Sequence, residues 1–492
     1  MINLVIPAAG AATRLRPLSS NTSKIMVRVN GKPCLDYIIE QATKIAEVGE
    51  IVIVDGQFSD IREYCERKHP NVKCVRQKSL DGPRDAIKIG INNLSDVSQP
   101  LVVWLGDAII LEDDMPLGED FLLCKEVDDH SAWCMWDGNS YYNKPKERIT
   151  NGVALVGLYS FADGGVACQA FNQSTDYDIS DALEKYGQFE RIMTDKWYDI
   201  GDLPTYYKSC ATLLDMKSRA FNRLEYNHDL GTIRKSPDYH NPESIDIIET
   251  EINWYKELNE NQQCFVPRIF GTNTTELTMS FESGTLLSDL MLYENLTASS
   301  WEYIIDKVFK IKLNYFNNRS KDWMFNKKFA DNTLDMWSGK VHKRLEQVDL
   351  PASCKTMLSV MAFDICSKAI PISGMHGDLH FGNILYNQQT DQIKLLDPRG
   401  KYGKHLGIHG DDIYDWAKLA HDLYHGYSSL VHNVKQNEDV KNIFVAKLKE
   451  YNLNVELILN GGLVLLATCI PLHYDCPNRQ QRFIDYVKAN SV

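Results

Sequence analysis

The sequence predicts an α/β protein built from two domains. Its 492 residues are too many for a single hydrophobic core, because one core usually serves about 100–200 residues. Up to residue 215, short β-branched runs alternate with amphipathic stretches, which favours a mostly parallel, doubly wound sheet. Beyond that point two strands and then long helical stretches follow. We therefore expect one domain at residues 1–215 and a second at residues 216–492.

The elements of the first domain are predicted from their hydrophobic periodicity. Short continuous apolar runs indicate buried strands, and apolar residues three or four positions apart indicate helices. The strands are expected at Leu4–Ile6, Glu50–Val54, Val72–Val75 and Leu101–Leu105, and the helices at Leu35–Ala46, Ser59–Lys68 and Arg84–Asn93.

The second domain is predicted to be α+β, with a smaller lobe at about residues 216–284 and a mainly helical lobe at about residues 285–492. In the smaller lobe, Phe221–Tyr226 and Gly231–Lys235 have the composition of two strands joined by the polar turn Asn227-His228-Asp229. Ser244 is a favourable helix N-cap before apolar residues at helical spacing. A long helix is expected to start there.

Composition excludes several classes of partner. The 53 basic and 66 acidic residues give a net charge of -13, so the chain lacks the basic field that nucleic acids and anionic membranes require. The 12 cysteines include no C-x-x-C pair, which indicates reduced thiols in a cytoplasmic protein. The longest apolar run, Leu457–Leu472, is short for a membrane span and is interrupted by Asn460 and Pro471. We expect a buried helix without membrane insertion, small-molecule partners, and an oligomeric state that the sequence leaves open.

A loop of small residues after the first strand carries the first candidate site. It runs from Pro7 to Pro17, and Lys24 follows ten residues after Arg14. Small residues let backbone N–H groups approach phosphate oxygens, and a helix start adds a favourable dipole. Arg14 and Lys24 would then neutralise a triphosphate. A plain tight turn, the competing interpretation, would need neither cation.

This loop resembles the signature A-A-G-x-G-T-R-L-x-P of the nucleotidyltransferase family that makes nucleotide sugars. The later P-K pair and G-K-P turn of that family correspond here to Ser23-Lys24 and Gly31-Lys32-Pro33. Ala12 replaces the second glycine and Ser23 replaces the proline, which puts the loop geometry near the phosphates in question. The resemblance implies a Rossmann-like, GT-A-like domain in which the nucleotide is held by Ala8, Ala9, Gly10, Ala11, Thr13, Arg14 and Lys24.

Later segments follow the order of the same family. Leu80–Ile87 resembles the loop and helix start that meet the base and ribose, which assigns nucleotide contacts to Gly82 and Asp85. Lys144 matches the lysine that holds the acceptor phosphate, and the strand containing Gly152 matches the one that lines the acceptor pocket.

Two carboxylates complete the first candidate site. Asp107 follows a predicted strand, where ligands bind in open α/β sheets, and Asp199 lies in a W-x-D-x-G segment. The resemblance makes both of them ligands of Mg²⁺. A phosphomonoester is already anionic at neutral pH, so it can attack the α-phosphate of an NTP without a general base. The site must supply in-line positioning, a metal ion and cations that offset the charge of the transition state.

A second motif, His376–Asn383, reads H-G-D-L-H-F-G-N. Asp378 precedes Asn383 by five residues, and Asp397 follows a predicted strand at Ile393–Leu396. This is the layout of kinase-type phosphoryl transfer. The first Asp orients and deprotonates the acceptor hydroxyl, while the Asn and the second Asp hold Mg²⁺ on the phosphates of ATP.

The second motif resembles the H-G-D-x-x-x-x-N loop of the aminoglycoside phosphotransferase and choline kinase family. The resemblance implies a protein-kinase-like fold in which Lys235 binds ATP and Glu251 is its ion-pair partner, with Glu249 as the competing partner. Asp397-Pro398-Arg399 replaces the usual start of D-F-G, so Arg399 is expected to contact substrate or phosphate. The segment Asp415–Leu419 resembles the helix that supports the catalytic loop.

A second His-Gly-Asp, His409–Asp411, lies in a loop rich in Gly and His. Position 416 is Trp rather than Asn, so we expect a loop over the acceptor pocket and no second catalytic loop, although a metal site is conceivable. Four histidines in this region have no carboxylate or Cys at a zinc-like spacing, and most are expected in solvent or in the core. They are His405, His409, His421 and His425.

Two such domains in one chain predict consecutive reactions. A kinase would turn an alcohol into a phosphomonoester, and a nucleotidyltransferase would couple a phosphomonoester to an NTP, with CTP favoured, for capsule or lipopolysaccharide assembly. One alternative is a UTP- or GTP-dependent sugar-1-phosphate nucleotidyltransferase with a sugar kinase. Another is a phosphocholine or phosphoethanolamine cytidylyltransferase with the matching kinase. An antibiotic-inactivating phosphotransferase with a vestigial first domain and a non-catalytic sugar-nucleotide sensor are further alternatives; the sensor is disfavoured because every catalytic position is filled.

Overall fold

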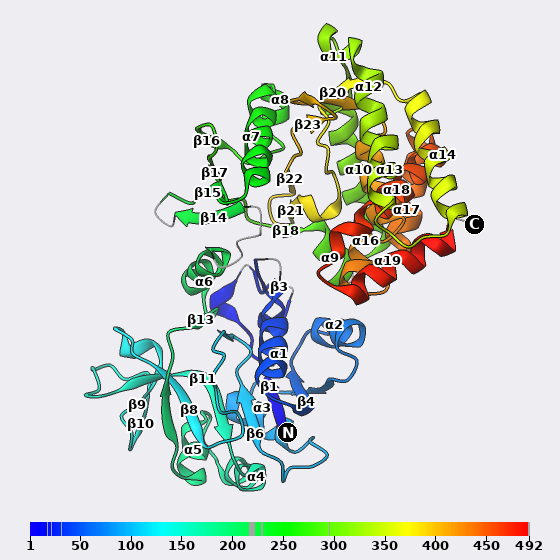
Figure 1. Cartoon of the computed structure of the whole chain (residues 1–492). Coiled ribbons are helices and arrows are strands. Elements are labelled where there is room, and N and C mark those ends of the chain that lie inside the picture. Colours follow the sequence, from blue (N-terminus) through cyan, green and yellow to red (C-terminus); the bar gives the residue numbers. More distant parts are fainter. Residues whose placement is uncertain are drawn as a thin grey trace. The chain divides into compact units, whose positions relative to one another are not determined.

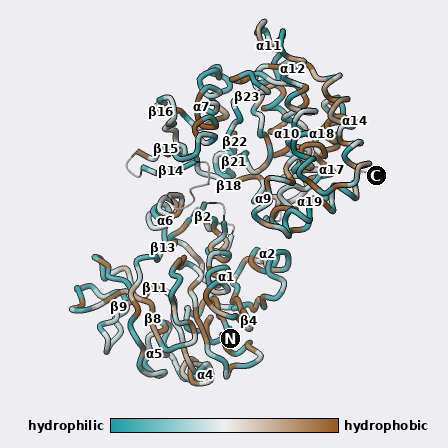
Figure 2. The backbone as a smooth tube through the Cα atoms, in the orientation of Figure 1, coloured by the Kyte–Doolittle hydropathy of each residue, from teal (hydrophilic) through white to brown (hydrophobic). Residues whose placement is uncertain are grey.

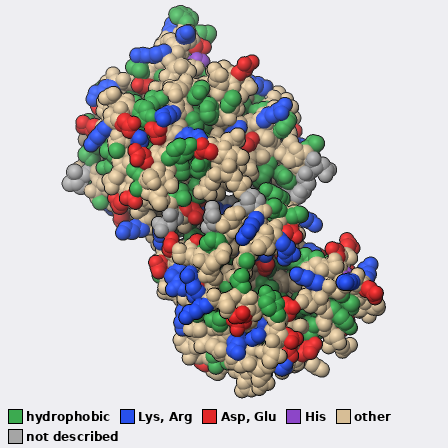
Figure 3. Space-filling model, turned by 180° about the vertical axis from the view of Figure 1, so that it is seen from behind, with side chains coloured by type: hydrophobic (Ala, Val, Ile, Leu, Met, Phe, Trp, Pro, Cys, Tyr) green, Lys and Arg blue, Asp and Glu red, His purple; other side chains and the backbone are tan. Residues whose placement is uncertain are grey.

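The computed structural model describes residues 1–16, 18–20, 22–30, 32–215, 222–227, 230–294 and 296–490. The chain divides into two compact units, Met1–Leu213 and Leu214–Val492, which are drawn in Figure 1. Pro17 and Gly31 of the N-terminal motifs lie outside the described residues, as do residues 216–221 and the tip of the predicted turn at 228–229. On the face drawn in Figure 3, basic and acidic side chains are both spread over each unit.

The sheet of the N-terminal unit is mixed, which corrects the prediction of a mostly parallel one. Strand β11 is antiparallel to β6, β8 and β9, whereas β1 is parallel to β4 and β6. A parallel neighbour needs a crossover of a dozen or more residues that is usually a helix, and residues 105–152 contain only one three-residue 3-10 helix. The strands are β1 (Ile2–Pro7), β4 (Val48–Asp55), β5 (Lys73–Arg76), β6 (Leu101–Trp104), β8 (Phe121–Lys125), β9 (Cys134–Trp136), β10 (Tyr141–Asn143), β11 (Val153–Phe161) and β12 (Glu190–Met193).

The predicted strands and helices of the first 100 residues coincide with observed elements, because their apolar residues fill the core of this unit. Hydrophobic residues follow the strands of the sheet in Figure 2, and Val5, Val52 and Val103 on three neighbouring strands are fully buried. Two short ladders, β2–β3 and β7–β13, lie outside the main sheet. The remaining elements are β2 (Arg28–Val29), β3 (Lys32–Pro33), β7 (Ala108–Ile110), β13 (Trp197–Asp199), α1 (Cys34–Ile45), α2 (Asp60–Lys68), α3 (Pro83–Ile91), α4 (Gly164–Gln173), α5 (Ser180–Tyr186) and α6 (Leu203–Asp215).

The C-terminal unit begins with a four-stranded antiparallel sheet and the helix α7 (Pro242–Glu257). The helix starts two residues before the predicted Ser244. Pro242 takes the first helical position, and the Asn241 side chain accepts a hydrogen bond from the Glu243 backbone N–H. Ser244 instead accepts a hydrogen bond from the backbone N–H of Asp238. The strands run in the order β14 (Asn222–Asn227), β15 (Thr232–Pro237), β17 (Leu277–Ser280) and β16 (Ile269–Thr272).

The rest of this unit is mainly helical, with short strands that carry the second motif. The helices are α8 (Glu260–Gln263), α9 (Leu287–Tyr293), α10 (Ala298–Tyr315), α11 (Trp323–Lys327), α12 (Phe329–Leu334), α13 (Lys340–Leu345), α14 (Ala352–Lys368), α15 (Tyr414–Leu423), α16 (Tyr427–His432), α17 (Glu438–Glu450), α18 (Val455–Cys469) and α19 (Pro477–Asn490). The strands are β18 (Thr285–Leu286), β19 (Asn318–Arg319), β20 (Pro371–Ser373), β21 (Ile384–Asn387), β22 (Gln392–Leu395), β23 (Lys401–Tyr402), β24 (His405–Leu406) and β25 (His409–Asp411).

Helix α18 contains the long apolar run that the sequence predicts to be buried. Together with the turn that follows, Val455–His473 is long and apolar enough to cross a membrane, but 67% of its most apolar window is buried inside the unit. A Cβ on Gly461 would lie 2.8 Å from the Ala417 Cβ, and one on Gly462 would lie 2.8 Å from the Ala420 Cβ. These two glycines therefore let α18 pack closely against α15.

Candidate functional site

The first candidate site is centred on two carboxylates that the β7–β13 ladder brings together. Asp107 directly precedes β7, and Asp199 ends β13 opposite Ala108. The backbone N–H of Ile200 donates to the Asp107 carbonyl, which joins the two segments at this point. Lys24 Nζ lies 2.5 Å from Asp107 Oδ2. A cation and two carboxylates from three distant segments thus meet at the end of β6.

The two carboxylates differ in pKa because their surroundings differ. Burial alone would raise the pKa of Asp107, but the charge of Lys24 lowers it overall. Burial and then the negative charge of Asp107 raise the pKa of Asp199 to about 6. Two carboxylates this close repel each other, and a hard divalent cation that prefers oxygen ligands relieves that repulsion. The pair therefore fits Mg²⁺.

The small-residue loop stays close to the sheet. The Ala8 N–H donates to the Val54 carbonyl, and a Cβ on Gly56 would lie 2.6 Å from the Ala9 carbonyl oxygen. Ala12 adopts φ 49° and ψ 35°, in the left-handed region that glycine enters without a steric cost. Alanine at the glycine position of the signature thus keeps a glycine-like backbone at some cost in strain. Around a Cβ on Gly10 no atom of a described residue comes within 4 Å.

The residues of this loop differ in exposure, and Arg14 acts on the charge of Asp107. Arg14 is exposed, and its charge contributes to the lowered pKa of Asp107. Thr13 and Arg14 form the 3-10 helix Thr13–Leu15, whose Leu15 is fully buried and anchors it. Ala11 lies between Gly10 and the strained Ala12, and it is half-buried.

Ser23 forms hydrogen bonds with Asp60 at the start of α2, a residue that the sequence motifs did not predict. The Ser23 backbone N–H and hydroxyl each donate to Asp60 at 2.6 Å, and the Thr22 hydroxyl donates to it at 2.6 Å. Proline, the residue of the signature at this position, could make neither of the two bonds from Ser23. Asp60 thus fixes the chain one residue before Lys24. The polar replacement of the proline is the one sequence signal for such a partner.

The other predicted ligand contacts of this unit are spread over three segments. Gly82 adopts φ 91° before α3, and a Cβ there would lie 2.6 Å from the Tyr177 carbonyl oxygen. Asp85, in the first turn of α3, accepts a hydrogen bond from Gln77. Lys144 is exposed in the loop after β10, and Gly152 follows the turn at Ile149. No contact joins Lys144 or Gly152 to the carboxylate pair among the described residues.

The second candidate site has a buried charge network at its centre. Lys235 on β15 lies 2.7 Å from Glu251 on α7 and 2.8 Å from Asp397, which follows β22. Burial alone would lower the pKa of Lys235, but the charges of Asp397 and Glu251 raise it overall. Glu249, the competing partner, is exposed. A Cβ on Gly400 would lie 1.9 Å from the Thr250 carbonyl oxygen, so this glycine lets the segment after Asp397 reach α7.

The segment His376–Asn383 is organised around Asp378. The Asn383 amide donates to both the backbone carbonyl and Oδ2 of Asp378 at 3.0 Å, which leaves its own amide oxygen directed elsewhere. Asp415 on α15 accepts hydrogen bonds from the backbone N–H groups of His376 and Gly377. The oxygen atoms of Asn383 and Asp397 are the type that Mg²⁺ prefers, so the loop fits a metal–ATP complex.

Lys418 on α15 is a further residue of this site that the sequence motifs did not predict. Its Nζ lies 2.7 Å from Asp378 Oδ1. Burial would raise the pKa of Asp378, but Lys418 and then His380 hold it well below its usual value. Arg399 donates to the Tyr414 hydroxyl at 3.3 Å, and its backbone N–H donates to the His376 carbonyl. Lys418 is the fourth residue of the segment D-W-A-K. Its place in this segment is the sequence signal from which its role could have been predicted.

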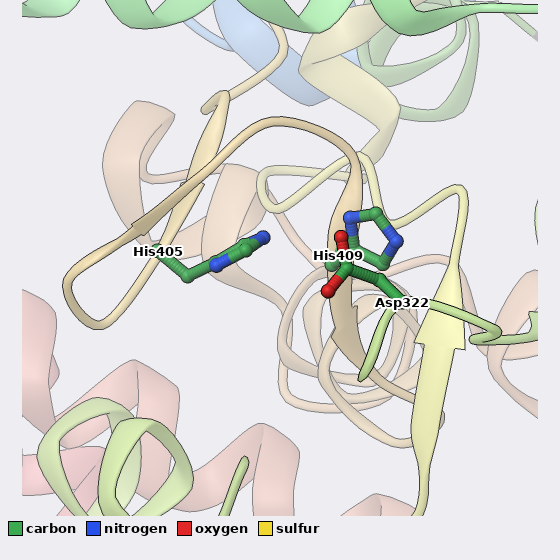
Figure 4. A group of neighbouring side chains, drawn as sticks. All are labelled: Asp322, His405 and His409. Atoms are coloured by element: carbon green, nitrogen blue, oxygen red, sulfur yellow. The ribbon is translucent and has the colours of Figure 1, made fainter. Parts of the chain in front are cut away.

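The histidine-rich loop contains a carboxylate companion that sequence spacing did not show. Asp322, which caps α11, lies beside His405 and His409, and one ligand atom of each lies within 4.8 Å of the others (Figure 4). The prediction that these histidines have no such companion is wrong for this pair, because Asp322 comes from a distant segment. His421 and His425 are buried in the core.

Asp411, of the second His-Gly-Asp, is fully buried and accepts hydrogen bonds from Trp337 and from the Ile413 and Tyr414 N–H groups.

Comparison with known proteins defines the class of the N-terminal unit. Residues 3–121 match the nucleotidyl transferase family, so this unit contains a nucleotidyl transferase domain.

The chain is also similar to individual proteins of this type. It is 29% identical over 261 residues to a UTP–glucose-1-phosphate uridylyltransferase of Staphylococcus epidermidis. This alignment covers 42% of this chain and 89% of that protein. It is 34% identical over 124 residues to the bifunctional protein GlmU of Methanocaldococcus jannaschii, covering 25% of this chain. It is 40% identical over 65 residues to a choline-phosphate cytidylyltransferase of Streptococcus pneumoniae, covering 13% of this chain. The chain spans 28% of the length of each of the last two proteins.

Solved structures also resemble part of this chain, at low sequence identity. A UDP-glucose pyrophosphorylase from Acinetobacter baumannii is 18% identical, with a TM-score of 0.39, and the match covers 44% of this chain and 95% of that one. The CTP:phosphocholine cytidylyltransferase from Streptococcus pneumoniae is 21% identical, with a TM-score of 0.35 and coverage of 43% and 99%.

Proposed function

We propose that the chain is a bifunctional enzyme whose domains, residues 1–215 and 216–492, catalyse two reactions. The first couples a phosphomonoester to an NTP and releases pyrophosphate; the second phosphorylates a small hydroxylated molecule with ATP. The observation that carries the first activity is the meeting of Lys24, Asp107 and Asp199 within a nucleotidyl transferase domain. The second activity is supported by the Lys235–Glu251–Asp397 network next to the Asp378–Asn383 loop.

In the first reaction, an oxygen of the phosphomonoester attacks the α-phosphorus of the NTP. A new P–O bond forms, the bond to the bridging oxygen breaks, and pyrophosphate leaves. Lys24 and Arg14 offset the negative charge of the triphosphate, and the loop from Ala9 to Thr13 offers backbone N–H groups to it. Asp107 and Asp199 would hold Mg²⁺, which supplies Lewis-acid stabilisation of the developing charge. Lys144 and Gly152 would contact the acceptor.

In the second reaction, the acceptor hydroxyl attacks the γ-phosphorus of ATP and ADP leaves. Asp378 orients the hydroxyl and takes its proton. Lys235, held by Glu251, binds the phosphates of ATP. Asn383 and Asp397 would hold Mg²⁺, which neutralises charge on the phosphates. Asp415 keeps the loop in place through the His376 and Gly377 N–H groups.

The NTP is proposed to be CTP and the product an activated precursor for capsule or lipopolysaccharide. A kinase followed by a cytidylyltransferase is the logic of polyol-phosphate or phosphocholine activation, and one relative is named a choline-phosphate cytidylyltransferase. UTP with a sugar 1-phosphate is the second candidate, because the alignment with 89% coverage is to a UTP–glucose-1-phosphate uridylyltransferase.

The test combines a substrate screen with two variants of the full-length chain. Pyrophosphate release is measured with each of four NTPs against sugar 1-phosphates, phosphocholine, phosphoethanolamine and glycerol phosphates, and the most active pair is kept. Asp107→Ala should abolish that release and preserve ATP-dependent phosphorylation, whereas Asp378→Asn should do the reverse. Loss of both activities in either variant would rule out two separate sites.

A further inference from the structure

Asp378 lies beside a group of basic side chains that the proposed reaction leaves unexplained. We call Lys340, Arg344, Arg399 and Lys418 the cationic cluster. Lys340 Nζ and Arg399 NH1 donate to the same Tyr414 hydroxyl, at 2.6 Å and 3.3 Å. Lys418 contacts Asp378 directly.

The cationic cluster has little negative charge around it. Among the residues that the structure describes, its ion pairs within 4.0 Å go to one carboxylate, that of Asp378, through Lys418. Arg344 is satisfied by the Thr468 carbonyl, which carries no charge. Desolvation and then the charges of Arg399, Arg344 and Lys418 lower the pKa of Lys340 well below its usual value. Cations that are largely withdrawn from water are normally paired with carboxylates, so a half-buried cluster like this one is stabilised when an anion joins it.

The four basic side chains are partly accessible while Tyr414 beneath them is fully buried. The Tyr414 hydroxyl accepts hydrogen bonds from two cations, so its own O–H can donate to a third group. A carboxylate or phosphate at this position would receive charge-assisted hydrogen bonds from Lys340 and Arg399. Tyr414 and Lys418 are four residues apart on α15, so they share one face of that helix.

We propose that the molecule phosphorylated at Asp378 is a hydroxylated anion, whose carboxylate or phosphate binds the cationic cluster while its hydroxyl faces Asp378. The proposal rests on the proposed kinase function and names the class of its acceptor. It disfavours choline and ethanolamine, because four cations around one carboxylate repel a positively charged acceptor. A bound anion would raise the pKa of Lys340 again, since a nearby negative charge favours the charged amine.

The first experiment measures ADP release by the full-length chain with acceptors that differ only in charge. Glycerol, glycerate and glycerol 3-phosphate form one series, and glucose, gluconate and glucose 6-phosphate form another; choline and ethanolamine are the cationic probes. An acidic member should exceed its neutral counterpart in kcat/KM by at least about tenfold. The carboxylate and phosphate members decide which anion is preferred. A neutral or cationic acceptor with the highest kcat/KM would overturn the proposal.

The second experiment separates the acceptor class from the kinase activity. Binding of the acidic probes to the ADP-loaded Asp378→Asn variant is measured by calorimetry, alone and combined with Lys340→Met. Lys340→Met should weaken binding by about 10- to 100-fold. Lys343→Met, which removes an exposed lysine from the same helix, should leave it unchanged. Binding without turnover in the unmodified chain would contradict the kinase function alone. Absence of binding, or an equal effect of both lysine variants, would contradict the anionic acceptor.

A second inference rests on different residues, the cluster of Asp322, His405 and His409. Their ligand atoms converge from the start of α11 and from strands β24 and β25, as Figure 4 shows. The Nδ1 atom of His409 is buried, and it has no hydrogen-bond partner among the described residues. The Phe325 ring lies 4.8 Å from the His405 ring and 5.1 Å from the His409 ring, which shields one side of the cluster.

We infer that this cluster binds a divalent transition-metal ion, of which zinc fits best. Two imidazole nitrogens and one carboxylate, with water as the fourth ligand, form a common tetrahedral zinc site. Metal binding would give the buried His409 nitrogen the partner it lacks. Because the ligands come from separate segments, a bound ion would join the loop of β24 and β25 to the start of α11.

The test uses Co²⁺ as a spectroscopic probe of the metal-stripped, full-length chain. Co²⁺ should produce the visible absorption of a tetrahedral site, and one equivalent of Zn²⁺ should remove it. His409→Ala and Asp322→Asn should each lose most of this absorption. His342→Ala, which removes an exposed histidine outside the cluster, should keep it. The inference would be wrong if the His409→Ala spectrum equalled that of the unmodified chain.

Discussion

Lys24 and Asp107 form an ion pair of 2.5 Å although 83 residues separate them in the sequence. The contact exists because the 3-10 helix Lys24–Met26 and the end of β6 reach the same edge of the sheet. Lys24 also opposes the burial and the repulsion by Asp107 that raise the pKa of Asp199. One side chain therefore lowers the pKa of both carboxylates relative to what burial and mutual repulsion would give.

Replacement of this lysine should abolish nucleotidyl transfer. Lys24→Met removes the cation next to Asp107 and the triphosphate, and we expect pyrophosphate release to fall by at least about 100-fold. Lys44→Met removes an exposed lysine that pairs with Asp113, and it should retain the activity. The measurement is coupled pyrophosphate release at saturating NTP. A Lys24→Met variant within threefold of the unmodified chain would exclude this role.

The bonds from Ser23 to Asp60 should be visible as a coupling free energy. Ser23→Pro keeps a compatible φ of -64° but removes both hydrogen bonds, and we expect about 1–3 kcal/mol less stability in the N-terminal unit. Asp60→Ala removes the carboxylate that accepts both bonds from Ser23, so the double variant should lose less than the sum of the two single variants. Urea denaturation of all four proteins measures this. Strict additivity would show that the two residues do not interact.

Ala12→Gly should stabilise the N-terminal unit. The left-handed backbone at this position costs an alanine about 1–2 kcal/mol, and glycine removes that cost while adding flexibility to the unfolded chain. We expect a net gain of about 0.5–1 kcal/mol in urea denaturation. Ala11→Gly, at a neighbouring position without a positive φ, should give no gain. Destabilisation by Ala12→Gly would argue that the Ala12 side chain packs favourably.

His425 should make the C-terminal unit less stable in mild acid. Burial lowers its pKa to about 4, below the value of about 6.5 in an unfolded chain. Between pH 6.5 and 4 the unfolded chain therefore binds a proton that the folded one does not, so the free energy of unfolding falls as pH falls through this window, by at most about 3 kcal/mol. Above pH 6.5 the histidine has no effect.

His425→Gln provides the comparison for that pH profile. Its side-chain amide can still donate to the Leu459 carbonyl, which His425 Nε2 contacts at 2.8 Å, but it does not titrate. The slope of stability against pH between 6.5 and 4 should be shallower in this variant, and His342→Gln should leave it unchanged. Parallel profiles for His425→Gln and the unmodified chain would contradict the assignment.

Local signals predicted the elements of the first 100 residues and the order of both motifs. The strand at Leu4–Ile6 and the helix at Ser59–Lys68 fall on β1 and α2, because hydrophobic periodicity depends on which residues are buried and little on distant contacts. The same signals failed for the sheet as a whole. The direction of β11 is set by how the chain returns after β6, and a return that contains no α-helix left β11 antiparallel to β6.

The sequence by itself determined the nucleotidyl transferase motif near the start of the chain, and it motivated the proposal of a phosphotransfer loop near His376, since both are short runs of specific residues. Only the tertiary structure decided which distant side chains join them. Asp60 beneath Ser23, the cationic cluster beside Asp378 and Asp322 beside two histidines all lie far along the chain from their partners. Such contacts carry no periodic or local pattern, because they depend on where separate helices and strands pack against one another.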